Sequence, residues 1–138
     1  MTSKNAAKGA RWEHDVVAYL RATLGPHAVR KPRQEGFEDK GDVHVSPFAL
    51  QLKDWGTASL GAWMDAATKQ AVHAGERYAA VVHKRRGSGT RRGFVTMELS
   101  TFRELVWRLH RAEELLRERN PVSYQQYAHE LEIESEKS

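Results

Sequence analysis

The chain has 138 residues, 40% of them hydrophobic and 29% charged, a composition typical of one globular domain with a core. It contains no cysteine, which excludes disulfide scaffolds and cysteine zinc sites and favours an intracellular, cytoplasmic protein. No apolar run approaches the roughly 18 residues of a membrane span, so we expect no membrane partner. Residues 1–95 hold 16 Lys and Arg against 9 Asp and Glu, a net charge of +7, and residues 96–138 hold 6 against 9, a net of −3. A basic body suits a polyanionic partner such as DNA.

The first half of the chain predicts one helix and three strands. The helix spans residues 4–24 and ends at Gly25-Pro26. Strands are expected over 27–33, 41–45 and 48–55. The inward stripe of the helix is predicted as Glu13, Val17, Leu20 and Leu24. Residues 48–55 alternate with period two, which puts Phe48, Leu50 and Leu52 on one face and Ala49, Gln51 and Lys53 on the other.

The second half predicts two further helices around a β-hairpin. Ser59 is the expected N-cap of a helix over 60–74, which stops at Gly75. Strands over 78–83 and 93–99 flank a loop rich in Gly and Arg. Thr101 and Glu104 form a capping box for a helix that runs to Arg119.

The order α-β-β-β-α-β-β-α predicts an α/β sandwich with a small mixed sheet flanked by helices. We expect one domain over residues 1–120. The acidic tail over 121–138 is expected to be a mobile or solvated end.

Three polar residues on neighbouring strands carry the predicted chemistry. Gln51 and Lys53 share a strand face, and Asp42 meets them if its strand pairs antiparallel. A hard cation, Mg²⁺ or Mn²⁺, takes oxygen ligands, which the Asp42 carboxylate, the Gln51 amide and the Leu52 backbone carbonyl can supply. Lys53 can orient or help deprotonate an attacking water and offset transition-state charge. Glu13 is a fourth candidate, binding the metal directly or through water.

These residues resemble the PD-(D/E)XK nuclease superfamily, whose restriction-endonuclease-like core runs helix, three strands, helix, strand. Gly41-Asp42 matches the family's Asp, and Gln51-Leu52-Lys53 matches its (D/E)-X-K triplet. The stretch Lys8-Gly9-Ala10-Arg11-Trp12-Glu13 is similar to the first helix of archaeal-type Holliday-junction resolvases, and residues 62–86 are similar to small phage-encoded resolvases. The resemblance implies hydrolytic, metal-dependent cleavage of branched DNA by a homodimer, because a four-way junction needs two symmetric cuts.

Gln51 departs from the family's usual acidic residue, and a neutral amide binds a cation more weakly. Some branches, including a transposon end-cleaving endonuclease, resemble this chain in carrying Gln there and remaining active. Three alternatives stay open. The chain could be a nicking or restriction-type nuclease on duplex DNA, a non-catalytic DNA-binding module, or an α/β domain without this chemistry. In that last case Asp42 caps a turn, Lys53 snorkels at a sheet edge and Glu13 is simply solvated.

Two basic segments are predicted to contact DNA phosphates, each contact adding salt-dependent affinity. They are the loop residues Lys84, Arg85, Arg86, Arg91 and Arg92, and the cluster Arg30, Lys31 and Arg33. For the loop, the alternative is a solvated hairpin tip. The third helix is a candidate dimer interface through Phe102, Leu105, Val106 and Leu109, and the same residues would also suit its own core.

Overall fold

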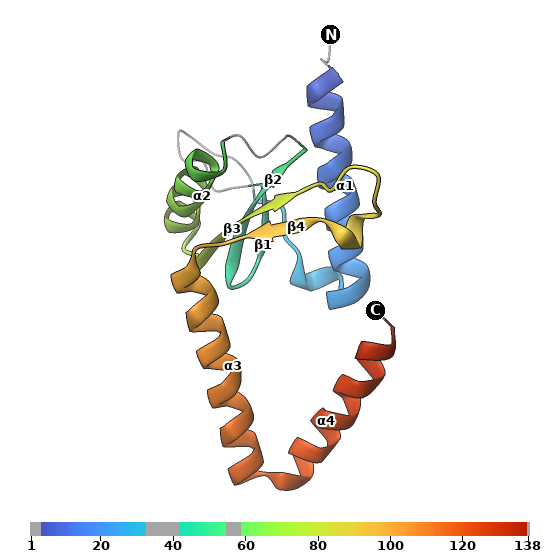
Figure 1. The fold of residues 1–138 in the computed structure, drawn as a ribbon, viewed down its shortest axis with the longest axis vertical. Helices are drawn as coiled ribbons and strands as arrows, with labels where there is room; N and C mark the ends of the chain where they lie inside the picture. The colour runs from blue at the N-terminus through green and yellow to red at the C-terminus, as the bar shows by residue number, and fades with distance from the viewer. Residues whose placement is uncertain (1–3, 33–41, 55–58, 138) are drawn as a thin grey trace. The chain divides into compact units, whose positions relative to one another are not determined.

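The computed structural model describes residues 4–32, 42–54 and 59–137, and its internal contacts divide the chain into two units, 1–98 and 99–138 (Figure 1). The division falls earlier in the chain than the boundary expected at residue 120. Unit 1 comprises α1 (Lys4–Leu24), η1 (Pro26–Ala28), β1 (Val43–Val45), β2 (Phe48–Lys53), α2 (Leu60–Ala74), β3 (Tyr78–His83), η2 (Thr90–Arg92) and β4 (Phe94–Thr96). Unit 2 comprises α3 (Leu99–Arg119) and α4 (Pro121–Glu136).

A four-stranded mixed sheet in the order β1-β2-β3-β4 forms the centre of unit 1. β1 and β4 pair antiparallel with their neighbours, whereas β2 and β3 are parallel and α2 connects them. The register pairs Val43 with Leu50 and Lys53 with His83. The expected α/β architecture, a small mixed sheet flanked by helices, is therefore confirmed.

The strand expected over residues 27–33 is not formed in its described part, so the predicted order of three strands after the first helix was wrong. Pro26 instead opens the short 3-10 helix η1, after Gly25 turns the chain with a φ of 98°. Beyond it, a single antiparallel bridge joins Arg30 to His44, with backbone N···O distances of 2.9 and 2.7 Å. Proline fixes its own φ and lacks an N–H, which favours a turn over a strand start here.

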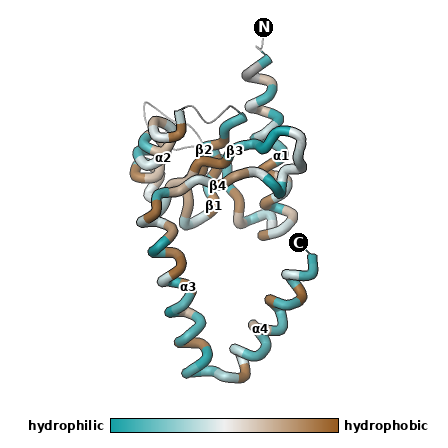
Figure 2. Tube along the Cα trace, viewed as in Figure 1, coloured by the Kyte–Doolittle hydropathy of each residue, from teal (hydrophilic) through white to brown (hydrophobic). Residues whose placement is uncertain are grey.

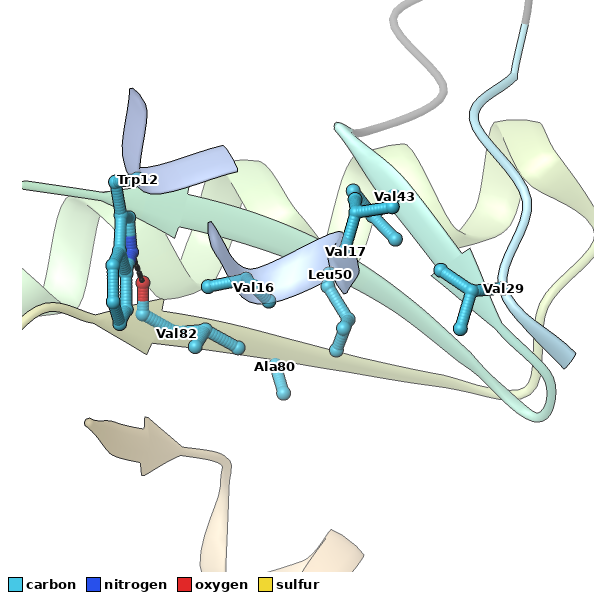
Figure 3. Packing of buried hydrophobic residues seen from close by; sticks show 8 residues of the cluster. All are labelled: Trp12, Val16, Val17, Val29, Val43, Leu50, Ala80 and Val82. Carbon is cyan, nitrogen blue, oxygen red and sulfur yellow. Dashed lines mark hydrogen bonds between the residues drawn. The ribbon is translucent and has the colours of Figure 1, made fainter. Parts of the chain in front are cut away.

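The buried face of α1 is rotated by about one residue from the predicted stripe. Trp12, Val16 and Val17 are buried and Leu20 is partly buried, whereas Leu24 is 56% exposed. The indole N–H of Trp12 donates to the carbonyl of Val82 at 3.2 Å (Figure 3). Burying that large ring with its N–H satisfied sets which face of α1 meets the sheet. The half-exposed Glu13 consequently lies beside this face, not at its head.

The two faces of β2 pack against different helices, as the alternation predicts. Leu50 belongs to the cluster on the α1 side, and Ala49 belongs to the cluster that α2 covers with Met64, Ala67 and Ala71. Gln51 and Lys53 follow Ala49 at two-residue intervals, so they lie on the α2 face. Figure 2 shows hydrophobic colouring in the two central strands of the sheet, β2 and β3. Gly75 ends α2 in the left-handed conformation, φ 69°, as predicted.

Unit 2 consists of two helices whose apolar residues remain largely exposed. α3 begins at Leu99, so Thr101 lies in its first turn and the predicted capping box was wrong. The acidic end forms α4, where the Asn120 side chain accepts a hydrogen bond from Ser123 N at 3.1 Å. Neither helix has a buried residue. Among the described helices of the whole chain, none is long and apolar enough to cross a membrane.

Candidate active site

Asp42 lies directly beside the Gln51-Leu52-Lys53 stretch. Its Oδ2 accepts a hydrogen bond from Leu52 N at 2.8 Å, and its own N–H donates to the carbonyl of Leu50 at 3.1 Å. Because Val43 pairs with Leu50, the antiparallel register places Asp42 opposite Gln51 at the end of β1. The antiparallel pairing of β1 with β2, on which the predicted meeting of Asp42 with Gln51 and Lys53 depended, is present.

The amide oxygen of Gln51 is buried and has no hydrogen-bond partner within residues 4–32, 42–54 and 59–137. Leaving a buried acceptor unpaired costs about 1–3 kcal/mol, so such atoms tend to mark a place where another group binds. In an extended strand the N–H and C=O of one residue point to the same edge. The Leu52 carbonyl therefore points to the β1 side, as its N–H does. A carboxylate, an amide oxygen and a carbonyl are ligands that suit a hard divalent cation.

Lys53 is held between the sheet and α2. Its Nζ lies 5.5 Å from the ring centroid of Trp63, within the range of a cation–π contact. The ring of Trp63 in turn lies 5.3 Å from that of His83, the β3 residue that pairs with Lys53. An aromatic contact and a strand neighbour thus restrict where the Lys53 ammonium can lie.

His83 is a site neighbour that sequence reasoning missed. It is 3% exposed, and neither ring nitrogen has a hydrogen-bond partner in the described part of the chain. Burial lowers the pKa of His83, which keeps its ring neutral at neutral pH and avoids a second positive charge beside Lys53. The available signal was a titratable residue at the end of the apolar strand Tyr78–His83.

Glu13 forms a separate ion pair. Its Oε1 lies 2.7 Å from Lys31 Nζ, with the Glu13 side chain 28% exposed. Arg30 likewise reaches Glu76 at 3.4 Å. The predicted basic cluster around residue 30 is thus partly neutralised by acidic neighbours, and its third member, Arg33, lies outside the described residues.

The basic loop begins at the end of the sheet where Lys53 lies. Lys84 N donates to the Lys53 carbonyl at 3.0 Å, which ties the start of the loop to the end of β2. Arg85 lies over the ring of Phe94, with its guanidinium carbon 5.6 Å from the centroid. The remaining three arginines are exposed: Arg86, Arg91 and Arg92. The loop therefore presents positive charge from an attachment point next to the candidate site.

No group of three His, Cys, Asp or Glu side chains that could hold a metal ion occurs among the residues that the structure describes. Three acidic residues that precede Asp42 in the sequence lie outside that part of the chain: Glu35, Glu38 and Asp39. Within it, a cation would take its protein oxygens from one carboxylate, one amide and one backbone carbonyl.

Comparisons of this chain with protein-family models, with curated proteins and with solved structures found no match. A functional assignment therefore depends on the residues themselves and on their geometry.

Proposed function

We propose that this protein is a metal-dependent, structure-specific DNA endonuclease that hydrolyses phosphodiester bonds at four-way junctions. One observation carries the proposal, the 2.8 Å hydrogen bond from Leu52 N to the Asp42 carboxylate. It joins the residue that matches the nuclease Asp to the Gln51-Leu52-Lys53 triplet, next to a buried amide oxygen that has no hydrogen-bond partner among the described residues.

Asp42, Gln51 and the Leu52 carbonyl would hold the divalent cation, Mg²⁺ or Mn²⁺. When bound, such an ion polarises the phosphate and promotes ionisation of the attacking water. The hydrogen bond from Leu52 N fixes one oxygen of Asp42 and so orients the carboxylate. Glu13 is paired with Lys31. The helix that carries it, α1, packs on the face of the sheet opposite Gln51, so Glu13 is not part of this set.

Lys53 would stabilise the negative charge that grows on the phosphate oxygens as water adds and the P–O bond breaks. Its contact with Trp63 restricts the ammonium before substrate arrives, so less reorganisation is needed during the reaction. The exposed arginines of the basic loop would contact the DNA backbone near the scissile phosphate.

A non-catalytic DNA-binding module is the competing class, and Gln51 is the observation that favours it. A neutral amide contributes no charge to cation binding, and affinity for hard cations depends on the number of charged ligands. Within enzymes, the competing proposal is a nicking or restriction-type nuclease on ordinary duplex DNA.

The protein is incubated with Mg²⁺ or Mn²⁺ and one of three substrates: a mobile four-way junction, a linear duplex or a flap. We expect the junction to be cleaved at least about 10-fold faster than the other two, which corresponds to roughly 1.4 kcal/mol in transition-state binding. All three substrates are matched in sequence, and products are resolved on denaturing gels. Equal rates on all three would remove the junction preference and leave the duplex nuclease. Binding without any cutting in either metal would instead support the non-catalytic module.

The proposed homodimer should depend on the exposed apolar residues of α3. Phe102 and Leu109 are 55% and 52% exposed, and Leu105 and Val106 are half-buried. Changing both Phe102→Glu and Leu109→Glu should raise the dimer dissociation constant by at least about 100-fold, because each buried apolar side chain contributes roughly 1.5–3 kcal/mol.

Light scattering over a dilution series measures this constant. Val72→Glu is the matched control, because Val72 is an exposed apolar residue of α2, 73% accessible, in the other unit. A doubly substituted protein that keeps the mass of a dimer would show that α3 is not the interface.

A further inference from the structure

Two neighbouring cavities open between α1 and the η2 segment. One is an open cleft of about 520 Å³, lined by His14, Asp15 and Ala18 from α1 and by Arg92 from η2. The other is a narrower, largely apolar slot of about 140 Å³, lined by Trp12, Val16, Leu20, Leu50, Val82 and Val95 among others. Tyr19, Thr90 and Arg91 line both cavities, so the slot and the cleft are adjacent and share these walls.

The slot has a fixed aromatic wall. Trp12 is 2% exposed, and its indole N–H bond to Val82 anchors the ring between α1 and the sheet (Figure 3). Gly93 lets the chain pass close to that ring, since a Cβ there would lie 3.0 Å from Cη2 of Trp12 and 3.0 Å from the His83 carbonyl oxygen. The Trp12 wall of the slot is thus set by close packing.

The entrance of the slot combines an aromatic ring with positive charge. Tyr19 is 41% exposed at the junction of the two cavities. Arg91 and Arg92 are both exposed, and Asp15 is the acidic residue of the cleft, so the two guanidinium groups outnumber the carboxylate. Aromatic rings next to guanidinium groups are the combination by which proteins bind single-stranded nucleic acid.

We propose that the slot and cleft together bind one unpaired pyrimidine nucleotide, with the base at Tyr19 and in the slot and its phosphate on Arg91 and Arg92. A cavity of about 150 Å³ holds a benzene-sized ring, so the slot, at about 140 Å³, fits a single six-membered ring better than the fused rings of a purine. The inference rests on the proposed function, since it takes DNA as the ligand. It gives that function a site for a base extruded at a branch point.

The test compares two fluorescein-labelled probes of equal length, a short oligothymidylate and an abasic oligomer with the same number of phosphates. Binding to the full chain is measured by anisotropy at low salt in EDTA, so that cleavage plays no part. We expect about 10-fold tighter binding of oligothymidylate than of the abasic oligomer, within the range for stacking of one base on an aromatic side chain. We also expect weaker binding of an oligoadenylate than of oligothymidylate.

Tyr19→Ala should abolish the preference for bases, and Tyr19→Phe should keep it. Ala18→Trp, at an exposed helix position that lines the cleft, should block entry and abolish the preference without removing any charge. The double change Arg91→Ala with Arg92→Ala should instead weaken binding of both oligomers by the same factor, because phosphate contacts do not distinguish bases. Trp107→Ala, an exposed aromatic residue of α3, is the matched control and should change neither affinity.

Equal affinity of the unmodified protein for the thymidylate and abasic oligomers would overturn the inference, as would a preference that survives both Tyr19→Ala and Ala18→Trp. The nuclease proposal fails separately. A protein that prefers bases in EDTA but never cuts DNA would contradict the nuclease alone, and one that cuts junctions without any base preference would contradict the nucleotide site alone.

Discussion

Replacing Lys53 with alanine should lower the rate of junction cleavage by at least about 100-fold, the usual loss when one group that stabilises transition-state charge is removed. Binding of the intact junction should change far less, because phosphate affinity is spread over many cationic side chains. Lys53 lies at the centre of the candidate site, one residue from Leu52, whose N–H holds the Asp42 carboxylate, and 5.5 Å from the Trp63 ring. Single-turnover cleavage and a gel-shift titration in Ca²⁺ measure the two quantities separately.

Lys69→Ala is the matched control for this change, because Lys69 is an exposed lysine of α2 and its loss should leave cleavage within about 3-fold of the unmodified rate, within the ±0.5 kcal/mol usual for surface substitutions. Thermal unfolding of the Lys53 variant shows whether loss of the Trp63 contact affects the fold. A folded Lys53→Ala protein that still cuts junctions at the original rate would mean that the active site lies elsewhere.

The positions of helices and strands could be predicted from the sequence where a hydrophobic pattern was long and was followed by a residue that ends the element. The period-two alternation of residues 48–53 placed Leu50 and Ala49 on the correct opposite faces of β2. Gly75 ended α2 because only a residue without a Cβ adopts its left-handed conformation at no cost. Such features depend on residues close in sequence, so they can be read without tertiary information.

The predicted buried face of α1 failed because it depended on a contact distant in sequence. The buried face of α1 is set by Trp12, whose hydrogen-bond partner Val82 is 70 residues away in the sequence. The spacing of apolar residues within the helix does not reveal that partner. The spacing of hydrophobic residues therefore predicted an amphipathic helix correctly but assigned the wrong residues to its buried face. The strand expected after Pro26 failed for a local reason, because Pro26 opens a 3-10 helix, and a single bridge from Arg30 to His44 follows it in the described part.

The candidate site shows the same division. The sequence predicted that Asp42 would meet the triplet if its strand paired antiparallel with that of Gln51, and β1 and β2 do pair in this way. The Trp63–His83 pair beside Lys53 could not be predicted, because it requires knowing that α2 crosses over the end of β3. Glu13 was placed with the triplet through the resemblance and the assumed stripe, and the structure pairs it with Lys31.

Changing Asp42→Asn should weaken Mn²⁺ binding by at least about 100-fold and should stop cleavage. Loss of a group that only supports a metal ligand already weakens metal binding by up to about 100-fold, and Asp42 is proposed as a ligand itself. The substitution removes the one carboxylate that the described site contributes. Asparagine keeps an oxygen that can accept the hydrogen bond from Leu52 N, so the local backbone should be preserved. Calorimetric titration with Mn²⁺, followed by junction cleavage, measures both effects.

Asp65→Asn serves as the control, because Asp65 is an exposed carboxylate on α2 that should contribute nothing to the metal. Gln51→Glu tests the same site in the opposite direction, since a second carboxylate should tighten Mn²⁺ binding by charge alone. If Asp42→Asn and Gln51→Glu both leave Mn²⁺ affinity unchanged, the Gln51 amide oxygen is not a metal ligand. If the unmodified chain binds DNA but takes up no Mn²⁺, the non-catalytic module replaces the nuclease.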